Sequence, residues 1–381
     1  MVKQVRALER SQWLDVLRGL AIIGVVSVHS IQITDHLVLY NKSNVFSYFL
    51  GLGKYGVELF FFLSGWLLVS IYGLNREPLS KVYILRRICR IYPLWILFLL
   101  INIFRLQFNS LRDLESPFGS SSGNPSFLHS PVGMLLLGVT FTLFVSASLW
   151  NTVIPGGWSI QAEVAHYILF PLIRRRSLNQ VLKILTLINC LTLGVDYFRA
   201  KIESFPKLIL CILDAWLRLG LYSTIGYFLI GILSYKVFSG SIKAWRDASF
   251  LTLKVSYSTA IFFALSLLVI PCPFGNQIEA ILFLVTMILI SLAILRIKLL
   301  NKFFQFLGRY SYFIYFMHIP ILGLLYLVLK GEILSLQSSP QFIVFTLVLF
   351  FALTFSSLLA VPSMKYFELP FMRLAHRPKS L

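Results

Sequence analysis

The sequence predicts an all-α polytopic membrane protein with about ten transmembrane helices, one further re-entrant or interfacial segment, and both termini in the cytoplasm. Three observations predict this class: the composition, the length of the apolar runs, and the placement of lysine and arginine. Of the 381 residues, 57% are apolar and 13% are charged, whereas soluble domains carry about 25% charged residues. Mean hydropathy is +0.80. No polar linker divides the chain, so we expect one transmembrane domain over residues 1–381, without a fused extracytoplasmic domain.

Long apolar runs recur along the whole chain. A helix needs about 20 mainly apolar residues to cross a bilayer. Backbone polar groups must be paired within lipid, and the alternation typical of barrel strands is absent, so these runs are expected to be helices. The candidate spans are residues 16–33, 56–74, 88–104, 131–149, 158–173, 181–198, 216–235, 255–271, 277–295, 310–329 and 341–361.

Basic residues set the orientation of the spans. The arginines within 86–90 and 174–176 both favour the cytoplasm, so an even number of crossings should separate them. Three candidates lie between, and 131–149 is the weakest, because it holds two glycines and follows a loop rich in Gly, Ser and Pro. With 131–149 as the re-entrant or interfacial segment, 25 of the 34 basic residues lie inside and nine outside.

The same clustering accounts for the net charge of +19. Bases gathered at the ends of apolar runs indicate membrane orientation, so we expect no nucleic-acid partner. The four cysteines show no C-x-x-C or metal-ligand spacing, and no metal site is expected. The first apolar run lacks an A-x-A cleavage site and contains Arg18 and His29, so it should remain as the first span.

Arg18 and His29 are the first of several ionisable groups inside predicted spans, where such groups are functional candidates. Eleven residues of helix return to nearly the same face over a rise of about 16 Å. Both side chains should therefore line one side of a common cavity. Arg18 has an alternative role as a surface anchor for topology, and His29 has one as a hydrogen bond between packed helices.

Three further ionisable groups lie on other predicted spans. Glu58 begins the second span among aromatic residues and needs a partner, which the outer half of the first helix offers in His29. Glu163 and His318 lie at similar depth in the spans 158–173 and 310–329. Each of them is alternatively a tie between helices, but four groups from separate helices favour a functional cluster.

Arg87 and Arg90 form an R-x-x-R pair, three residues apart on one helix face at the inner surface. Guanidinium groups in this arrangement suit a ligand that bears phosphates, although orientation alone also requires arginines there. Arginines on the cytoplasmic side, with a histidine and carboxylates nearer the outer side, indicate either transfer of a chemical group across the membrane or transport of a substrate. The spacing leaves both possibilities open.

Five blocks of sequence occur in a fixed order over nearly the whole chain. The blocks are Leu14-Asp-Val-Leu-Arg-Gly-Leu-Ala-Ile with His29, Gly56-Val-Glu-Leu-Phe-Phe-Phe-Leu-Ser-Gly65, Arg87-Ile-Cys-Arg90-Ile-Tyr-Pro93, Trp158-Ser-Ile-Gln-Ala-Glu163-Val-Ala-His-Tyr167-Ile-Leu-Phe-Pro171 and Gly308-Arg-Tyr-Ser-Tyr-Phe-Ile-Tyr-Phe-Met-His318. They resemble the blocks of the bacterial acyltransferase family 3, including its R-x10-H spacing, here Arg18 to His29. The block at 158–171 departs from the family pattern at Gln161, Val164 and His166.

The resemblance implies a multi-pass O-acyltransferase of the bacterial cytoplasmic (inner) membrane. Its expected co-substrate is acyl-CoA, commonly acetyl-CoA, from the cytoplasm, with no permanently bound cofactor. The expected acceptor is a hydroxyl of a surface glycan or glycolipid, such as lipopolysaccharide O-antigen or exopolysaccharide. The residues that carry these roles are His29 and Glu58 for catalysis, Arg18, Arg87 and Arg90 for CoA, and Trp158, Ser159, Glu163, Tyr167, Tyr315 and His318 for acceptor binding or support.

Two mechanisms are compatible with these residues. In the first, which we favour, the acceptor attacks the thioester directly with His29 as general base, since a histidine pKa lies near neutrality. In the second, His29 forms an acyl-histidine intermediate. Glu58 is expected to orient the imidazole in either case. The competing class is a proton-coupled exporter of lipid or glycan that uses His29, Glu58 and Glu163 as a relay.

Overall fold

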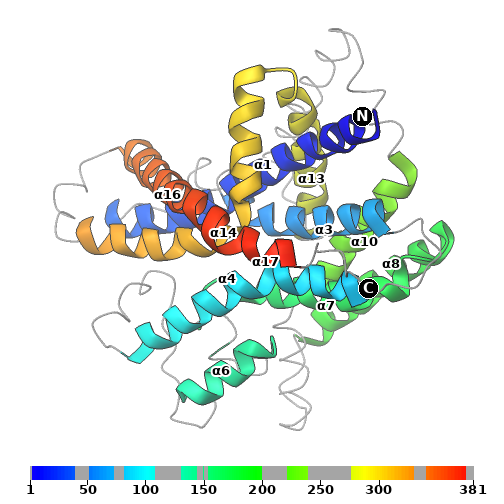
Figure 1. Cartoon of the computed structure of the whole chain (residues 1–381), viewed down its shortest axis with the longest axis horizontal. Helices are drawn as coiled ribbons and strands as arrows, with labels where there is room; N and C mark the ends of the chain where they lie inside the picture. Colours follow the sequence, from blue (N-terminus) through cyan, green and yellow to red (C-terminus); the bar gives the residue numbers. More distant parts are fainter. Residues whose placement is uncertain are drawn as a thin grey trace. The chain divides into compact units, whose positions relative to one another are not determined.

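In the computed structural model, every regular element among the described residues is a helix; these residues are 2–38, 51–72, 81–107, 130–143, 149, 153–199, 221–238, 276–329 and 340–374. The predicted span 255–271 lies outside these residues, as do 216–220 at the start of another. Figure 1 shows the helices in sequence colours. They are α1 (Val2–Val38), η1 (Leu52–Tyr55), α3 (Gly56–Tyr72), α4 (Lys81–Gln107), α6 (Pro131–Val139), α7 (Gly157–Ile173), α8 (Leu178–Arg199), α10 (Leu221–Phe238), α13 (Asn276–Ile294), α14 (Lys298–Leu329), α16 (Gln341–Ser363), η7 (Met364–Glu368) and α17 (Leu369–Leu374).

Within the described residues, four helical segments are long and apolar enough to cross a membrane by themselves. Their outward-facing side chains are apolar as well: on α16, Phe342, Phe350 and Leu358 are each about 60% exposed and eight residues apart. Such a face is stable in lipid and costly in water, so the predicted membrane class is confirmed. The four segments are Gln12–Asp35, Leu52–Tyr72, Lys298–Leu329 and Gln341–Leu374.

The chain forms two compact units. Unit 1 contains Met1–Phe60 and Phe238–Val361, and unit 2 contains Phe61–Val237 and Pro362–Leu381. In unit 1, α1 packs along α14, and both contribute to the same core with η1 and α13. In unit 2, α4 packs against α6, η7 and α17.

Glycines allow the helices of unit 1 to approach closely. A Cβ added at Gly308 of α14 would overlap the carbonyl oxygen of Asp15, and one added at Gly19 of α1 would overlap that of Phe304. Small residues at such crossings are typical of helix pairs in membranes, where close backbone packing replaces the hydrophobic effect. These contacts, close to the middle of α1 and near the start of α14, fix the two helices against each other.

In unit 2, α6 is a short helix that docks onto α4. The side chain of Ser130 accepts a hydrogen bond from the Gly133 amide at 3.0 Å, and Pro131 occupies the first turn, so the helix has a favourable N-terminus. The Trp95 indole donates to the Gly138 carbonyl at 2.8 Å. Nine residues rise only about 13 Å, so α6 is too short to cross a bilayer.

Candidate functional site

His29 of α1 and His318 of α14 lie side by side in unit 1. Their ring centroids are 5.2 Å apart, with 39° between the ring planes. His318 is 1% exposed, and the Tyr315 ring lies 5.8 Å from it. The structure therefore brings together two histidines that the sequence placed on separate helices at similar depth.

The hydrogen bonds of the two imidazoles indicate their tautomers. His318 Nδ1 lies 3.1 Å from the Ile314 carbonyl oxygen, which only accepts, so Nδ1 carries the proton. Its Nε2 then holds the lone pair, and this buried atom has no hydrogen-bond partner among the described residues. His29 Nδ1 lies 3.0 Å from Gln32 Oε1. With the amide oxygen as acceptor, His29 Nε2 is likewise the basic nitrogen.

Glu58 lies near the start of α3 and belongs to the same unit. Its Oε2 atom is buried and has no hydrogen-bond partner within the described ranges. Gln32, one helical turn beyond His29, contacts its Nδ1 atom, and the orienting role expected of Glu58 stays a prediction. Gln32 was missed because an amide carries no charge and does not stand out inside an apolar run, although its i+3 spacing from His29 was a usable signal.

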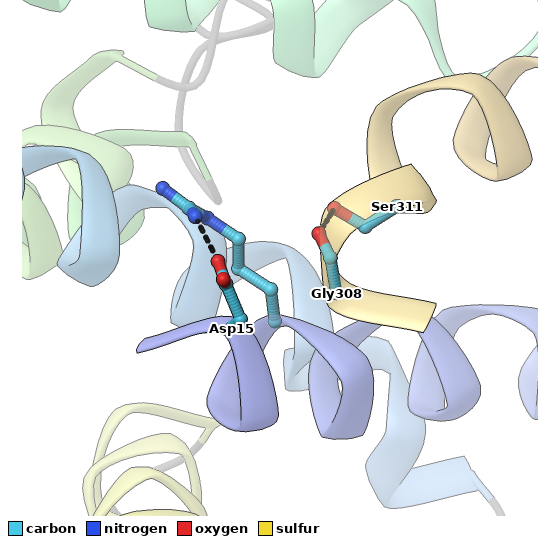
Figure 2. A network of polar contacts seen from close by, with 4 residues as sticks. Asp15, Gly308 and Ser311 are labelled. Carbon is cyan, nitrogen blue, oxygen red and sulfur yellow. Dashed lines mark hydrogen bonds and ion pairs between the residues drawn. The ribbon is translucent and has the colours of Figure 1, made fainter. Parts of the chain in front are cut away.

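Arg18 forms an ion pair with Asp15, and Figure 2 shows Asp15 with Gly308 and Ser311. Arg18 Nη1 and Asp15 Oδ1 are 2.8 Å apart, one turn along α1. The Asp15 backbone is the one that Gly308 contacts, and the hydroxyl of Ser311 donates to the Gly308 carbonyl at 2.9 Å. The arginine is therefore fixed at the crossing of α1 and α14, about 16 Å along the helix from His29.

Arg87 of α4 lies among three tyrosines in unit 2. Its guanidinium carbon is 5.4 Å from the ring centroid of Tyr167, 5.9 Å from that of Tyr72 and 6.0 Å from that of Tyr83. Across the described residues, no carboxylate forms an ion pair with it, and its buried Nε has no hydrogen-bond partner. The tyrosines hold the positive charge through their rings and, at Tyr167 and Tyr72, through side-chain hydrogen bonds as well.

Glu163 of α7 accepts two hydrogen bonds on one oxygen. The Ser64 hydroxyl of α3 donates to Oε1 at 3.0 Å, and the Tyr167 hydroxyl donates to the same atom. Tyr167 therefore connects Glu163 to Arg87, two residues that the sequence placed in separate clusters. Nothing in the helical spacing revealed Ser64, which belongs to another helix.

Arg90 has an acidic neighbour that the sequence did not indicate. Glu368 of η7 is 5% exposed, interacts electrostatically with Arg90, and lies 3.5 Å from the Ser363 hydroxyl. It ends a π-helical turn that follows Pro362. Such turns insert an extra residue and often occur at functional sites.

Trp158 and Ser159 lie at the start of α7. The Ser159 hydroxyl donates to the Gly156 carbonyl at 2.9 Å, and the Trp158 ring packs 6.4 Å from that of Phe61. His166, where the block departs from the family pattern, is buried: it stacks on Phe228 and lies 3.2 Å from the Thr224 hydroxyl. Its contacts are those of a packed core residue.

Apolar membrane-length helices that carry Arg18, His29, Glu58 and His318 define a multi-pass membrane protein. A family model described as an acyltransferase domain matches residues 11–361, and the chain belongs to the acyltransferase 3 family. It is a membrane acyltransferase, and the resemblance of the five sequence blocks is confirmed. Neither the curated proteins nor the solved structures include a match to this chain.

Proposed function

We propose that this membrane acyltransferase moves an acetyl or related acyl group from cytoplasmic acyl-CoA to a hydroxyl of a surface glycan, such as lipopolysaccharide O-antigen or exopolysaccharide, at the bacterial inner membrane. The observation that carries the donor assignment is Arg87. Its guanidinium is partly buried and forms no ion pair with a described residue, which suits a binding site for an anion. Acyl-CoA brings phosphates, and Arg90 lies one turn away on the same helix.

The proposed chemistry uses His29 as general base. The acceptor oxygen attacks the thioester carbonyl carbon, and its proton passes to His29 Nε2. The C–S bond then breaks, and the imidazolium returns the proton to the departing CoA thiolate. Gln32 holds the ring through Nδ1, and Glu58 offers a buried carboxylate near the start of α3. Arg18 is the remaining candidate for the CoA phosphates.

The proposed acceptor side includes the other predicted residues. His318 and Tyr315 lie beside His29, and a basic Nε2 on His318 suits a hydroxyl donor. Glu163 with Tyr167 supplies a carboxylate in unit 2. Trp158 and Ser159 support the start of α7.

The proposed topology has ten crossings, a segment 131–149 that does not cross, and both ends in the cytoplasm. It is supported by contacts between helix ends in unit 2: Arg174 Nη1 donates to the Tyr72 carbonyl at 2.9 Å, and Lys236 Nζ donates to that of Arg176. These basic residues share one end of the helices, as the positive-inside rule requires. Reporter fusions after Leu149 and after Ser177 test the topology, and an outside signal at Ser177 contradicts it.

Calorimetry with CoA tests the donor assignment on purified wild type, Arg87→Lys and Arg90→Lys. An ammonium keeps the charge but not the planar donor geometry, so each variant should keep its topology and lose affinity. A lost charge-assisted bond costs about 1.5–3 kcal/mol, or roughly tenfold to a hundredfold. If all three proteins bind CoA with equal affinity, the two arginines serve only to set the membrane topology. An exporter has no reason to bind CoA, so absence of binding favours that class.

Mass spectrometry of surface glycans tests the acceptor. Cells with the protein should carry acyl groups that cells without it lack. The mass added identifies the acyl chain, and fragmentation identifies the sugar. Unchanged glycans in cells that express the protein would contradict the proposed acceptor while leaving the donor assignment to calorimetry.

A further inference from the structure

Three tyrosines from three helices surround the Arg87 guanidinium. We propose that Tyr72, Tyr83 and Tyr167, here called the tyrosine cage, are positioning residues that hold Arg87 in the donor site without neutralising its charge. The inference deepens the proposed function and rests on it for the identity of the ligand. It assigns a role to Tyr72 and Tyr83, which the sequence analysis did not single out.

The cage is built from parts that are themselves fixed. Tyr72 ends α3 and Tyr83 lies near the start of α4, and their rings meet edge to face with centroids 5.1 Å apart. The Tyr83 hydroxyl donates to the Tyr167 carbonyl at 2.9 Å, which joins α4 to α7. Arg174 holds the Tyr72 carbonyl from the end of α7. Tyr83 is one turn before Arg87 on the same helix. The helix that carries the arginine therefore also carries one of the three tyrosines.

The charge balance distinguishes this cage from a salt bridge. The face of an aromatic ring attracts a cation through its quadrupole, yet it carries no net charge. A carboxylate at the same place would form charge-assisted bonds with the guanidinium and compete with an incoming phosphate. Burial raises the pKa of the Tyr83 phenol, so this ring stays neutral. Arg87 is thus oriented in advance and keeps its positive charge for an anion.

Arg90 shows the contrast on the same helix. The buried carboxylate of Glu368 acts on Arg90 electrostatically, whereas Arg87 has no carboxylate partner in the described part of the chain. The two arginines of the R-x-x-R pair therefore differ in how much of their charge is compensated. We expect Arg87 to supply most of the attraction for the CoA phosphates.

A double-mutant cycle between Tyr83→Leu and Arg87→Gln tests the cage on the purified full chain. If Tyr83 acts through Arg87, Tyr83→Leu should weaken CoA binding about threefold to thirtyfold, the range of a cation–π contact. It should have less than a twofold effect once Arg87 is Gln, because no cation remains to be held. Tyr83→Phe keeps the ring and should bind within about threefold of wild type.

The matched control is Tyr92→Leu, on the same helix. Tyr92 also donates its hydroxyl to a backbone carbonyl, that of Val139 at 2.6 Å, but its ring packs on Phe141. It should show no coupling to Arg87→Gln. If Tyr83→Leu fails to accumulate in the membrane, Tyr72→Leu takes its place in the cycle.

The same cycle is measured by thermal melting without CoA. A cage that holds the guanidinium makes the two substitutions non-additive in melting temperature as well. Additive effects in both measurements would overturn the cage and leave the tyrosines as packing residues. If wild type does not bind CoA, the donor assignment fails, and the melting cycle alone decides whether the cage holds Arg87.

Discussion

The position of the Glu163 carboxylate should depend on two hydrogen bonds that end on the same oxygen. Ser64 and Tyr167 both donate to Oε1, and a hydrogen bond to a charged group contributes about 1.5–3 kcal/mol. Removing one donor leaves the oxygen tied by the other. Ser64→Ala and Tyr167→Phe should therefore each lower acyl transfer only about tenfold, the lower end of this range. The double variant loses both hydrogen bonds and should lower it about a hundredfold or more.

The assay is the acyl content of surface glycans by mass spectrometry, normalised to the amount of protein in the membrane. Ser70→Ala is the matched control, because Ser70 lies on the same helix and its hydroxyl donates to the Leu67 carbonyl. CoA affinity should fall less for Tyr167→Phe than for Tyr167→Leu, because Phe keeps the ring that faces Arg87 and loses only the hydroxyl that hydrogen-bonds the guanidinium. Wild-type activity in the double variant, together with an inactive Glu163→Ala, would show that Glu163 acts without these hydrogen bonds. An active Glu163→Ala would make it a structural residue.

Other substitutions probe separate parts of the molecule. His29→Ala should abolish acylation at unchanged membrane abundance, since loss of a general base typically costs 10²–10⁴-fold; near-normal acylation refutes its role. Gly308→Ala should lower stability by about 1–3 kcal/mol in thermal melting, whereas Gly226→Ala should not, because an added Cβ there meets only a Leu185 methyl at 3.9 Å. Glu368→Gln removes a negative charge beside Arg90 and should tighten CoA binding by up to about fivefold, or 1 kcal/mol, most clearly at low salt. Weaker binding would instead make Glu368 a positioning residue.

The membrane class and most helix positions followed from the sequence, because a helix in lipid must be long, apolar and internally hydrogen-bonded. The runs 88–104, 158–173 and 341–361 correspond closely to parts of α4, α7 and α16. The segment 131–149 was predicted to be a weak span, since glycine and hydroxyl residues interrupt it; α6 covers its first part and ends at Val139, and residues 144–148 lie outside the described ones.

The individual chemical groups of the site were predictable for a similar reason. An arginine, histidine or carboxylate is costly inside a membrane helix and stands out against an apolar run. The sequence therefore indicated His29, Glu163, Arg87 and His318, and the ordered blocks indicated the family. Neutral polar residues do not stand out in this way, so Gln32 and Ser64 were missed.

The partners of these groups depended on tertiary structure. Helical periodicity states which residues share a face of one helix, but it does not state which faces of different helices meet. The meeting of α1 with α14 depends on backbone contacts at Gly19 and Gly308, and these place His29 against His318. The joining of α3, α4 and α7 places Tyr72, Tyr83 and Tyr167 around one guanidinium. By itself, then, the sequence determined that the helices lie in lipid, where they lie along the chain and which ionisable residues they carry, because these properties follow from local composition. Only the packed structure decided which groups act on one another, because that depends on contacts between residues far apart along the chain.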